Sequence, residues 1–355
     1  MPTAIRTYAF INAKLRARIS KLLPESLFVK MARAYSLQEA LTLLRDTPYS
    51  ILDEIYRTTG DLKLGELELL KDEVKVFLEV AKYVSGGTLD LVQALLLGYE
   101  MENVKNAVRL FFDRKIRNRS VDTSVHYLLR ERIMHDVSID GIINAENLGE
   151  LLGALASAPY SSLVAELGER VLSEGTLFRL EIAFDHFYYK NLMEKAEMLD
   201  SRDRREALRI IGVEIDLVNI NWIIRFRRFY NLPMKEVMSL VIPRGYHLKA
   251  ERIQEAYTSQ NVTNVLQDVI KSDYPGLSAL LSSQPTDSVS RLLLVERVLE
   301  RILMYETHRV LMGYPFTIGI ILAYFIFKKS EIKKVRAVLN AKLYKIPEDR
   351  IEDVI

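Results

Sequence analysis

The feature that most constrains this chain is a threefold internal repeat. A first module, Leu37–Tyr49, recurs without gaps at Leu148–Tyr160 and Val262–Tyr274. A second module follows each copy and begins at an acidic residue, which is Glu100, Asp216 or Glu331. The modules recur in the same order about 115 residues apart, which is long for a solenoid repeat and typical of a small domain. The repeat therefore predicts three pseudo-equivalent domains, spanning residues 1–118, 119–231 and 232–355.

Both modules have the apolar spacing of helices. In the second module of the first copy, Met101, Val104, Ala107 and Val108 share one face of a 3.6-residue helix, and the other copies keep this spacing. Strand alternation is absent, and 15 Gly and 10 Pro in 355 residues leave room for long helices. We predict an all-α fold. We also expect the acidic residue of each second module to open its helix, where a carboxylate offsets the positive end of the helix dipole.

The composition excludes several classes of protein. The chain has no cysteine, which excludes disulfides, thiolate nucleophiles and cysteine-zinc sites. With 49% hydrophobic and 27% charged residues, it is not a disordered sequence. Arg6 and Lys14 interrupt any apolar stretch at the N-terminus, so no signal peptide is expected there.

One apolar run has the length of a short membrane span. Residues Val310–Phe327 carry no charge. However, the repeat aligns the end of this run with Ala94–Glu100 and Ile210–Asp216, and the helices that lead into those two segments are rich in charge. Equivalent elements should have equivalent surroundings. We therefore predict a buried or partner-facing helix in the latter part of the run, with Pro315 near its start.

Sequence motifs for catalysis are missing. The chain contains no phosphate-binding glycine loop, no HExxH and no GxSxG. None of the five histidines lies three or four residues from another, so no helical face presents a metal-binding pair. A site built between repeats around His186, Asp185 and Tyr188 is the enzyme alternative, but adjacent residues face different directions on a helix. We expect no active site, cofactor or metal.

Basic residues form the candidate binding surface. Arg109 and Arg225 occupy matching places in two copies, and Arg225, Arg227 and Arg228 alternate with aromatic residues. Such a pattern can contact an acidic protein, RNA or anionic lipid, or it can simply be the solvated face of a helix. The net charge of only +2 argues against nucleic acid as the partner. A helical protein that binds RNA or anionic lipid remains the alternative function.

Several motifs resemble the C subunits of archaeal-type and bacterial V-type ATPases, a family that includes the eukaryotic V-ATPase d subunits. The N-terminal residues from Tyr8 to Arg16 resemble the start of that family, and Glu100-x-x-Asn103 and Asp216-x-x-Asn219 resemble its repeated helix motifs. The similarity extends from about Tyr8 to Pro347. The third copy departs from the pattern because Lys334 stands where the others have Asn.

The resemblance implies a fold and a function. Members of this family form a funnel of three helical domains around a central cavity. The funnel sits on the membrane proteolipid ring at the cytoplasmic face and receives the foot of the central shaft. By this resemblance, the chain is a non-catalytic rotor component in ATP-linked proton or sodium transport. Its partners are the shaft proteins and the proteolipid ring, it binds no nucleic acid, and it is a monomer when isolated.

Overall fold

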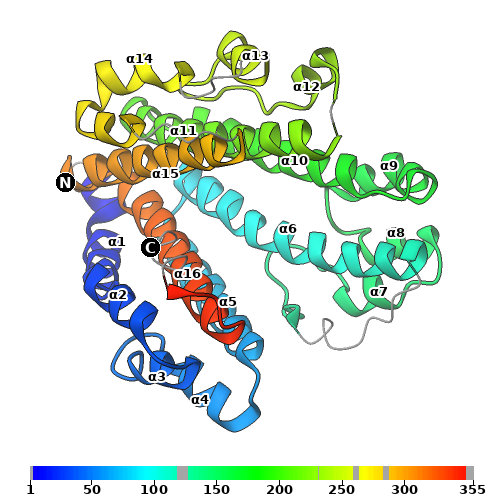
Figure 1. The fold of residues 1–355 in the computed structure, drawn as a ribbon, viewed down its shortest axis with the longest axis horizontal. Helices are drawn as coiled ribbons and strands as arrows, with labels where there is room; N and C mark the ends of the chain where they lie inside the picture. The colour runs from blue at the N-terminus through cyan, green and yellow to red at the C-terminus, as the bar shows by residue number, and fades with distance from the viewer. Residues whose placement is uncertain (1–2, 118–126, 231, 259–263, 283–287, 349–355) are drawn as a thin grey trace. The chain divides into compact units, whose positions relative to one another are not determined.

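The computed structural model of the protein is built from helices (Figure 1). It describes residues 3–117, 127–230, 232–258, 264–282 and 288–348, and within these ranges there is no strand. The predicted all-α fold is confirmed. The domain boundaries predicted near residues 118 and 231 fall outside the described residues. The chain divides into two compact units, residues 1–188 with 324–355 and residues 189–323.

The helices follow the order of the repeat. The first unit begins with α1 (Thr3–Ile19) and α2 (Glu25–Arg33), and the first copy then supplies α3 (Leu37–Thr42), α4 (Ser50–Thr59), α5 (Leu62–Ala81) and α6 (Gly86–Arg117). After α7 (Ile139–Asn144), the second copy supplies α8 (Leu148–Ala154), α9 (Ser161–Glu174), α10 (Phe178–Glu197) and α11 (Ser201–Arg225). The third copy follows α12 (Met234–Leu240) and α13 (Ala250–Thr258) with α14 (Asn264–Asp273), a 3₁₀ segment (Pro275–Ser282), α15 (Ser288–Met312) and α16 (Gly319–Leu343).

The first module is a capped short helix followed by turns. Ser36 accepts a hydrogen bond from the backbone N–H of Glu39 (3.2 Å), and the Glu39 carboxylate accepts one from the N–H of Tyr35 (2.7 Å). Asn147 and Glu150 repeat this capping pattern at the start of α8, where Asn147 accepts from the N–H of Glu150 (2.9 Å) and Glu150 accepts from the N–H of Glu146 (2.8 Å). Both helices end well before the module's tyrosine, so the module is shorter as a helix than its sequence pattern indicates.

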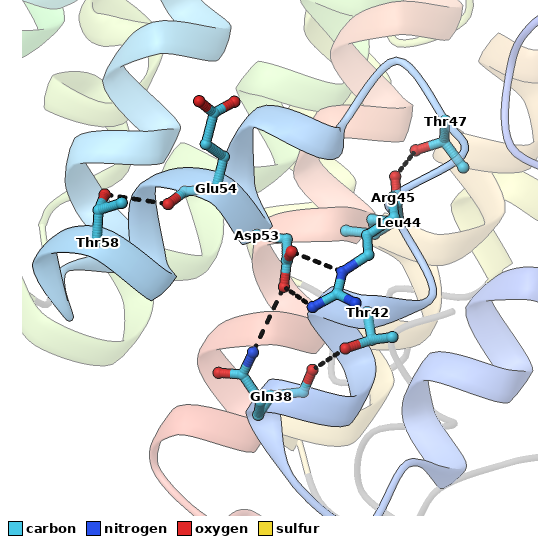
Figure 2. Close-up of polar contacts among 8 residues, drawn as sticks. All are labelled: Gln38, Thr42, Leu44, Arg45, Thr47, Asp53, Glu54 and Thr58. Carbon is cyan, nitrogen blue, oxygen red and sulfur yellow. Dashed lines mark hydrogen bonds and ion pairs between the residues drawn. The ribbon is translucent and has the colours of Figure 1, made fainter.

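In the first copy, a buried carboxylate holds the turn that follows α3 (Figure 2). Asp53 accepts hydrogen bonds from Arg45 Nε at 2.7 Å and from Gln38 Nε2 at 3.5 Å. The side chain of Asp53 is buried, whereas that of Arg45 is half exposed. The ungapped repeat places Ala156 and Val164 at the corresponding positions of the second copy, so this ion pair belongs to the first copy and not to the repeat.

Each long helix that carries the second module packs on helices of the following copy. In the first unit, Arg109 of α6 contacts Glu181 of α10 at 2.6 Å. In the second unit, Arg209 of α11 donates to Glu306 of α15 at 2.7 Å. Helix α16 of the third copy returns to the first copy, where Arg336 contacts Glu66 of α5 at 2.8 Å. The packing order is therefore cyclic along the chain.

Two apolar cores within the first unit show the same exchange between copies. One contains Phe112 of α6 together with Tyr160 and Phe184 from the second copy. The other contains Met31 and Tyr49 from the N-terminal part together with Val335, Val338 and Leu339 of α16. The apolar residues of α6 and α16 pack against residues of the next copy. Neither helix could therefore bury its apolar face within its own sequence repeat.

The apolar run Val310–Phe327 is divided between two helices. Its first residues end α15 at Met312, Pro315 lies in the connecting loop, and the latter part forms the buried start of α16. The prediction of a helix in the latter part of the run is confirmed. No helix in the described part of the chain is long and apolar enough to cross a membrane.

Candidate partner-binding surface and the carboxylate joints

The three repeated carboxylates lie in the middle of long helices and not at helix starts. Glu100 lies within α6, Asp216 within α11 and Glu331 within α16, and all three are buried. The expectation that each one opens a helix is wrong, because the helices begin a dozen or more residues earlier, at Gly86, Ser201 and Gly319. The carboxylates instead bind backbone N–H groups of the segment that leads into the next copy. We call these three places the joints.

At the joint in α6, Glu100 holds the chain that precedes the second copy. It accepts hydrogen bonds from the backbone N–H groups of Met134 (2.8 Å) and His135 (2.7 Å). The His135 Nδ1 atom and the Tyr160 hydroxyl lie 2.7 and 2.9 Å from its other oxygen. Burial, together with the adjacent Glu100 charge, raises the pKa of Tyr160 well above its ordinary value, so its hydroxyl stays a donor.

At the joint in α16, Glu331 holds the N-terminal segment in the same manner. It accepts from the backbone N–H of Leu23 at 2.5 Å and from the Tyr49 hydroxyl. Lys328, one turn away, donates to both Glu331 (3.0 Å) and Tyr49 (2.7 Å). Tyr49 and Tyr160 are the equivalent last residues of the first module, so these two joints use the same pair of residue types.

At the joint in α11, Asp216 accepts from the backbone N–H groups of His247 (2.7 Å) and Leu248 (3.0 Å). Burial raises the pKa of Asp216 to about 7, against the effect of these hydrogen bonds. Tyr274, the third module tyrosine, donates to Glu306 at 2.8 Å and lies 2.9 Å from His247 Nε2. Burial lowers the pKa of His247 to about 4, so this imidazole is neutral at pH 7.

The asparagines of the second module add a reciprocal backbone bond at two joints. Asn103 donates to the carbonyl of Leu129 (2.7 Å) and accepts from its N–H (2.9 Å). Asn219 makes the same pair with Ile242, at 2.8 and 2.9 Å. At the third joint, Lys334 cannot make this pair, and its ammonium lies 5.7 Å from the centre of the Phe28 ring. The shared role of the asparagines thus covers two copies of three.

Among the candidate partner-binding arginines, Arg109 is engaged within the first unit. Its Nε contacts Glu181 at 2.6 Å and its Nη1 contacts Asn106 at 2.6 Å, and its side chain stays partly exposed. Asp185, one turn along α10, similarly accepts from the buried Lys105 at 2.9 Å. Asp185 therefore has a structural partner, which explains the residue without a catalytic role.

Arg225 and Arg227 lie at the C-terminal end of α11, in the second unit. Arg225 is exposed, and its guanidinium lies 5.1 Å from the centre of the Trp222 ring. The helix continues into a π-helical turn, Phe226–Tyr230, where Phe226 is buried and Phe229 is 67% exposed. Arg227 is half buried, and the side chain of Arg228 lies outside the described residues. This end of α11 thus presents a cation on an aromatic surface.

The histidine and carboxylate side chains do not form a metal site in the part of the chain that the structure describes. No three His, Asp or Glu side chains are arranged there to hold a metal ion. At the joints in α6 and α16 the carboxylate accepts from the module tyrosine, whereas at the joint in α11 Tyr274 donates to Glu306. Sequence reasoning missed the tyrosines as hydrogen-bond partners of these carboxylates. The signal was present, since each first module ends in Tyr.

These features define a triplicated all-helical protein whose repeated polar residues hold one copy to the next. Comparison with known sequences agrees: the pattern of the family described as ATP synthase (C/AC39) subunit matches residues 11–354, and the chain belongs to this family.

Individual relatives are similar along nearly their whole length. The chain is 23% identical to the C subunit of the A-type ATP synthase of Methanosphaera stadtmanae, covering 98% of this chain and 87% of the relative. It is 23% identical to the corresponding protein of Pyrococcus horikoshii, with 98% and 90% covered. The Methanosarcina mazei protein of the same name is 25% identical, with 98% and 92% covered. The chain is thus a member of a family of ATP synthase subunits.

Proposed function

We propose that this chain is a non-catalytic adaptor in the rotor of an A-type or V-type ATP synthase. It links the central shaft to the proteolipid ring at the cytoplasmic face of the membrane, and it is a monomer when isolated. In this proposal, residues 1–118, 119–231 and 232–355 form three domains around a central opening. Family membership supports a role as a component of the complex. The contact of the last copy with the first supports the closed arrangement of the three domains.

The cyclic packing suits such an adaptor. Glu331 of the third copy holds the first copy through Leu23 and Tyr49, as Glu100 of the first copy holds the second through His135 and Tyr160. A chain whose last repeat packs on its first can close with pseudo-threefold symmetry. A closed collar could match a symmetric ring on one side and admit an asymmetric shaft on the other.

The arginines at the end of α11 are the proposed contact with the shaft. Arg225, Arg227 and Arg228 offer planar guanidinium groups that make paired, oriented hydrogen bonds to carboxylates or carbonyls. Arg109 is a secondary candidate, because Glu181 already occupies its Nε.

The experiment reverses Arg227 and Arg228 together to Glu and measures binding to the isolated shaft proteins. At a desolvated interface the double reversal should cost several kcal/mol, or about 100-fold or more in affinity. The control reverses Lys30 and Arg57, which are exposed residues of α2 and α4, and should leave binding unchanged. If wild type and the Arg227→Glu/Arg228→Glu variant bind the shaft proteins with equal affinity, these two arginines do not lie in the interface.

A further inference from the structure

The joint between the third and first copies holds a second buried carboxylate, Glu73 of α5. Glu73 is 4% exposed, and its Oε2 atom has no hydrogen-bond partner in the described part of the chain. Helix α5 packs along the start of α16 (Figure 1), where the ring centres of Phe77 and Tyr324 lie 5.9 Å apart. A buried carboxylate with an unpartnered oxygen favours its neutral form. Glu73 therefore differs from the joint residue Glu331, both of whose oxygens accept hydrogen bonds.

Titratable groups from three neighbouring segments surround Glu73. Those that act on it or feel its charge are Lys328, Glu331 and Tyr324 of α16, Tyr49 at the start of α4, Arg18 of α1, and Asp72 beside it on α5. The ammonium of Lys328 is already shared between Tyr49 (2.7 Å) and Glu331 (3.0 Å). Arg18 and Asp72 are exposed, so water screens their charges. Ionised Glu73 would therefore be a second buried anion beside Glu331, and both would share the same lysine.

The ionisation of Glu73 falls near neutral pH. Burial raises its pKa to about 7, against the attraction of Lys328, and the charge of Glu331 adds to the rise. Burial also raises the pKa of the Tyr49 and Tyr324 hydroxyls above their ordinary values, so both phenols stay neutral. Near neutral pH, the charge of this joint therefore changes at Glu73 and not at the tyrosines.

The contacts around Glu73 fasten α16 to the first copy. Apolar residues of α16 lie in the core that the first copy forms around Tyr49. Arg336 contacts Glu66 of α5 at 2.8 Å, and Asn340 donates to the same carboxylate at 3.0 Å. These contacts join segments that are far apart in the sequence, so α16 can detach from them without breaking the backbone hydrogen bonds of another helix. Detachment gives the Glu73 carboxylate access to water.

We propose that Glu73 makes this joint a pH-dependent latch, in which α16 stays packed on the first copy while Glu73 is protonated and detaches locally when Glu73 loses its proton. Detachment hydrates the ionised carboxylate, which the packed joint cannot do. The packed joint binds the proton more tightly than the detached one, so a rise in pH favours detachment. The latch is a property of the chain itself and can hold or fail independently of the rotor assignment.

The test measures backbone hydrogen exchange of the purified full chain at pH 6 and pH 8, by mass spectrometry of its peptides. Exchange rates are first corrected for their intrinsic dependence on pH. A carboxyl group with a pKa of about 7 in the packed joint and 4.5 in the detached one makes detachment about tenfold more favourable at pH 8 than at pH 6. The protection of peptides within residues 328–343 should therefore fall about tenfold.

Peptides of α6 around Glu100 serve as the reference within the same unit. Because the apolar core of α6 is formed with the second copy, detachment of α16 leaves α6 folded. At pH 8 the α6 peptides should therefore remain more strongly protected than those of α16. Equal corrected rates in the two helices would mean that the whole unit opens together, and the latch would be wrong. Unchanged protection of α16 between the two pH values would also contradict it.

Two variants assign the effect to Glu73. Glu73→Gln keeps the shape and cannot lose a proton, so α16 should show the same protection at both pH values. Glu54→Gln, at an exposed residue of α4, removes the same formal charge and should keep the pH dependence of wild type. A pH dependence that persists in Glu73→Gln would show that another group controls α16. If Glu73→Gln does not fold, the comparison of α16 with α6 in wild type still decides whether this joint opens locally.

Discussion

The hydroxyl of Tyr160 donates a 2.9 Å hydrogen bond to Glu100, which lies buried in the middle of α6 and belongs to the preceding copy of the repeat. Tyr49 and Glu331 make the corresponding contact between the first and third copies. These pairs show that the unit that repeats in sequence is not the unit that packs. The packed unit is a long helix of one copy with the short helices of the next.

Loss of the Tyr160 hydroxyl should weaken the joint without leaving a cavity. Tyr160→Phe removes one donor from a buried carboxylate and should lower the free energy of unfolding by about 1–3 kcal/mol. Tyr35 is 97% exposed, so Tyr35→Phe should change it by less than about 0.5 kcal/mol. Urea denaturation of the two variants checks this. Equal stabilities would show that the hydroxyl contributes nothing at the joint.

The two asparagines should matter more than the lysine at the same position of the repeat. Asn103→Ala and Asn219→Ala each leave a backbone N–H and carbonyl without their partner, so each should destabilise by about 2–3 kcal/mol. Lys334→Ala breaks no such reciprocal backbone pair, and its contact with the Phe28 ring is worth about 0.5–1 kcal/mol. Similar losses for all three, measured by urea denaturation, would contradict the assigned backbone bonds.

Glu73 should make the protein less stable as pH rises. Burial raises its pKa to about 7, against the attraction of Lys328, and the charge of nearby Glu331 adds to the rise while that of Arg18 opposes it. One of its carboxylate oxygens is buried without a hydrogen-bond partner in the described structure. The folded state therefore holds this proton between pH 4.5 and 7, where the unfolded state has released it, and stability falls across this window.

The variant Glu73→Gln keeps the shape and removes the charge. It should match wild type near the lower end of this window and exceed it by about 3 kcal/mol above the upper end, since each pKa unit corresponds to about 1.4 kcal/mol. Glu54→Gln, at an exposed residue of α4, removes the same charge, and its stability difference from wild type should not show this pH dependence. Urea denaturation of wild type and variant at several pH values across this window measures the difference. A stability difference that does not change with pH would show that Glu73 does not titrate with a raised pKa.

Gly245 should be irreplaceable because it lies against a joint carboxylate. A Cβ there would lie 2.1 Å from the Oδ1 atom of Asp216 and 3.0 Å from the carbonyl oxygen of Leu248. Gly245→Ala should therefore destabilise by about 1–3 kcal/mol or more. Gly153, inside α8, has open space around it, so Gly153→Ala should stabilise by about 0.5–1 kcal/mol. Thermal unfolding of both variants should shift in opposite directions, and a neutral Gly245→Ala would show that the joint can rearrange.

The repeat and its helical periodicity were enough to predict the fold class, because apolar spacing reports directly on which face of a helix is buried. The equivalence of the repeats also predicted a helix in the latter part of Val310–Phe327, where α16 begins. Position within a helix was harder to predict. Glu100, Asp216 and Glu331 were expected at helix starts, since an exposed carboxylate is stabilised there, but these three are buried and are stabilised by backbone N–H groups far along the chain.

Contacts between copies could not be read from the sequence at all. Nothing in the pattern around Arg109 indicates that it will form an ion pair with Glu181. The two residues belong to different copies and come into contact only because α6 packs on α10. The pairing of Tyr49 with Glu331, from opposite ends of the chain, is hidden for the same reason. Arg109, Tyr49 and Glu331 belong to the repeated modules, whereas Glu181 does not, and only the structure shows which residues are partners.

The rotor assignment is tested most directly by isolating the chain from its own cells. A tagged chain, purified from detergent-solubilised membranes in the presence of nuclease, should bring down both the shaft proteins and the membrane proteolipid, identified by mass spectrometry. Recovery of the tagged chain without either partner, while the catalytic subunits of the same ATP synthase are intact in those membranes, would contradict the account.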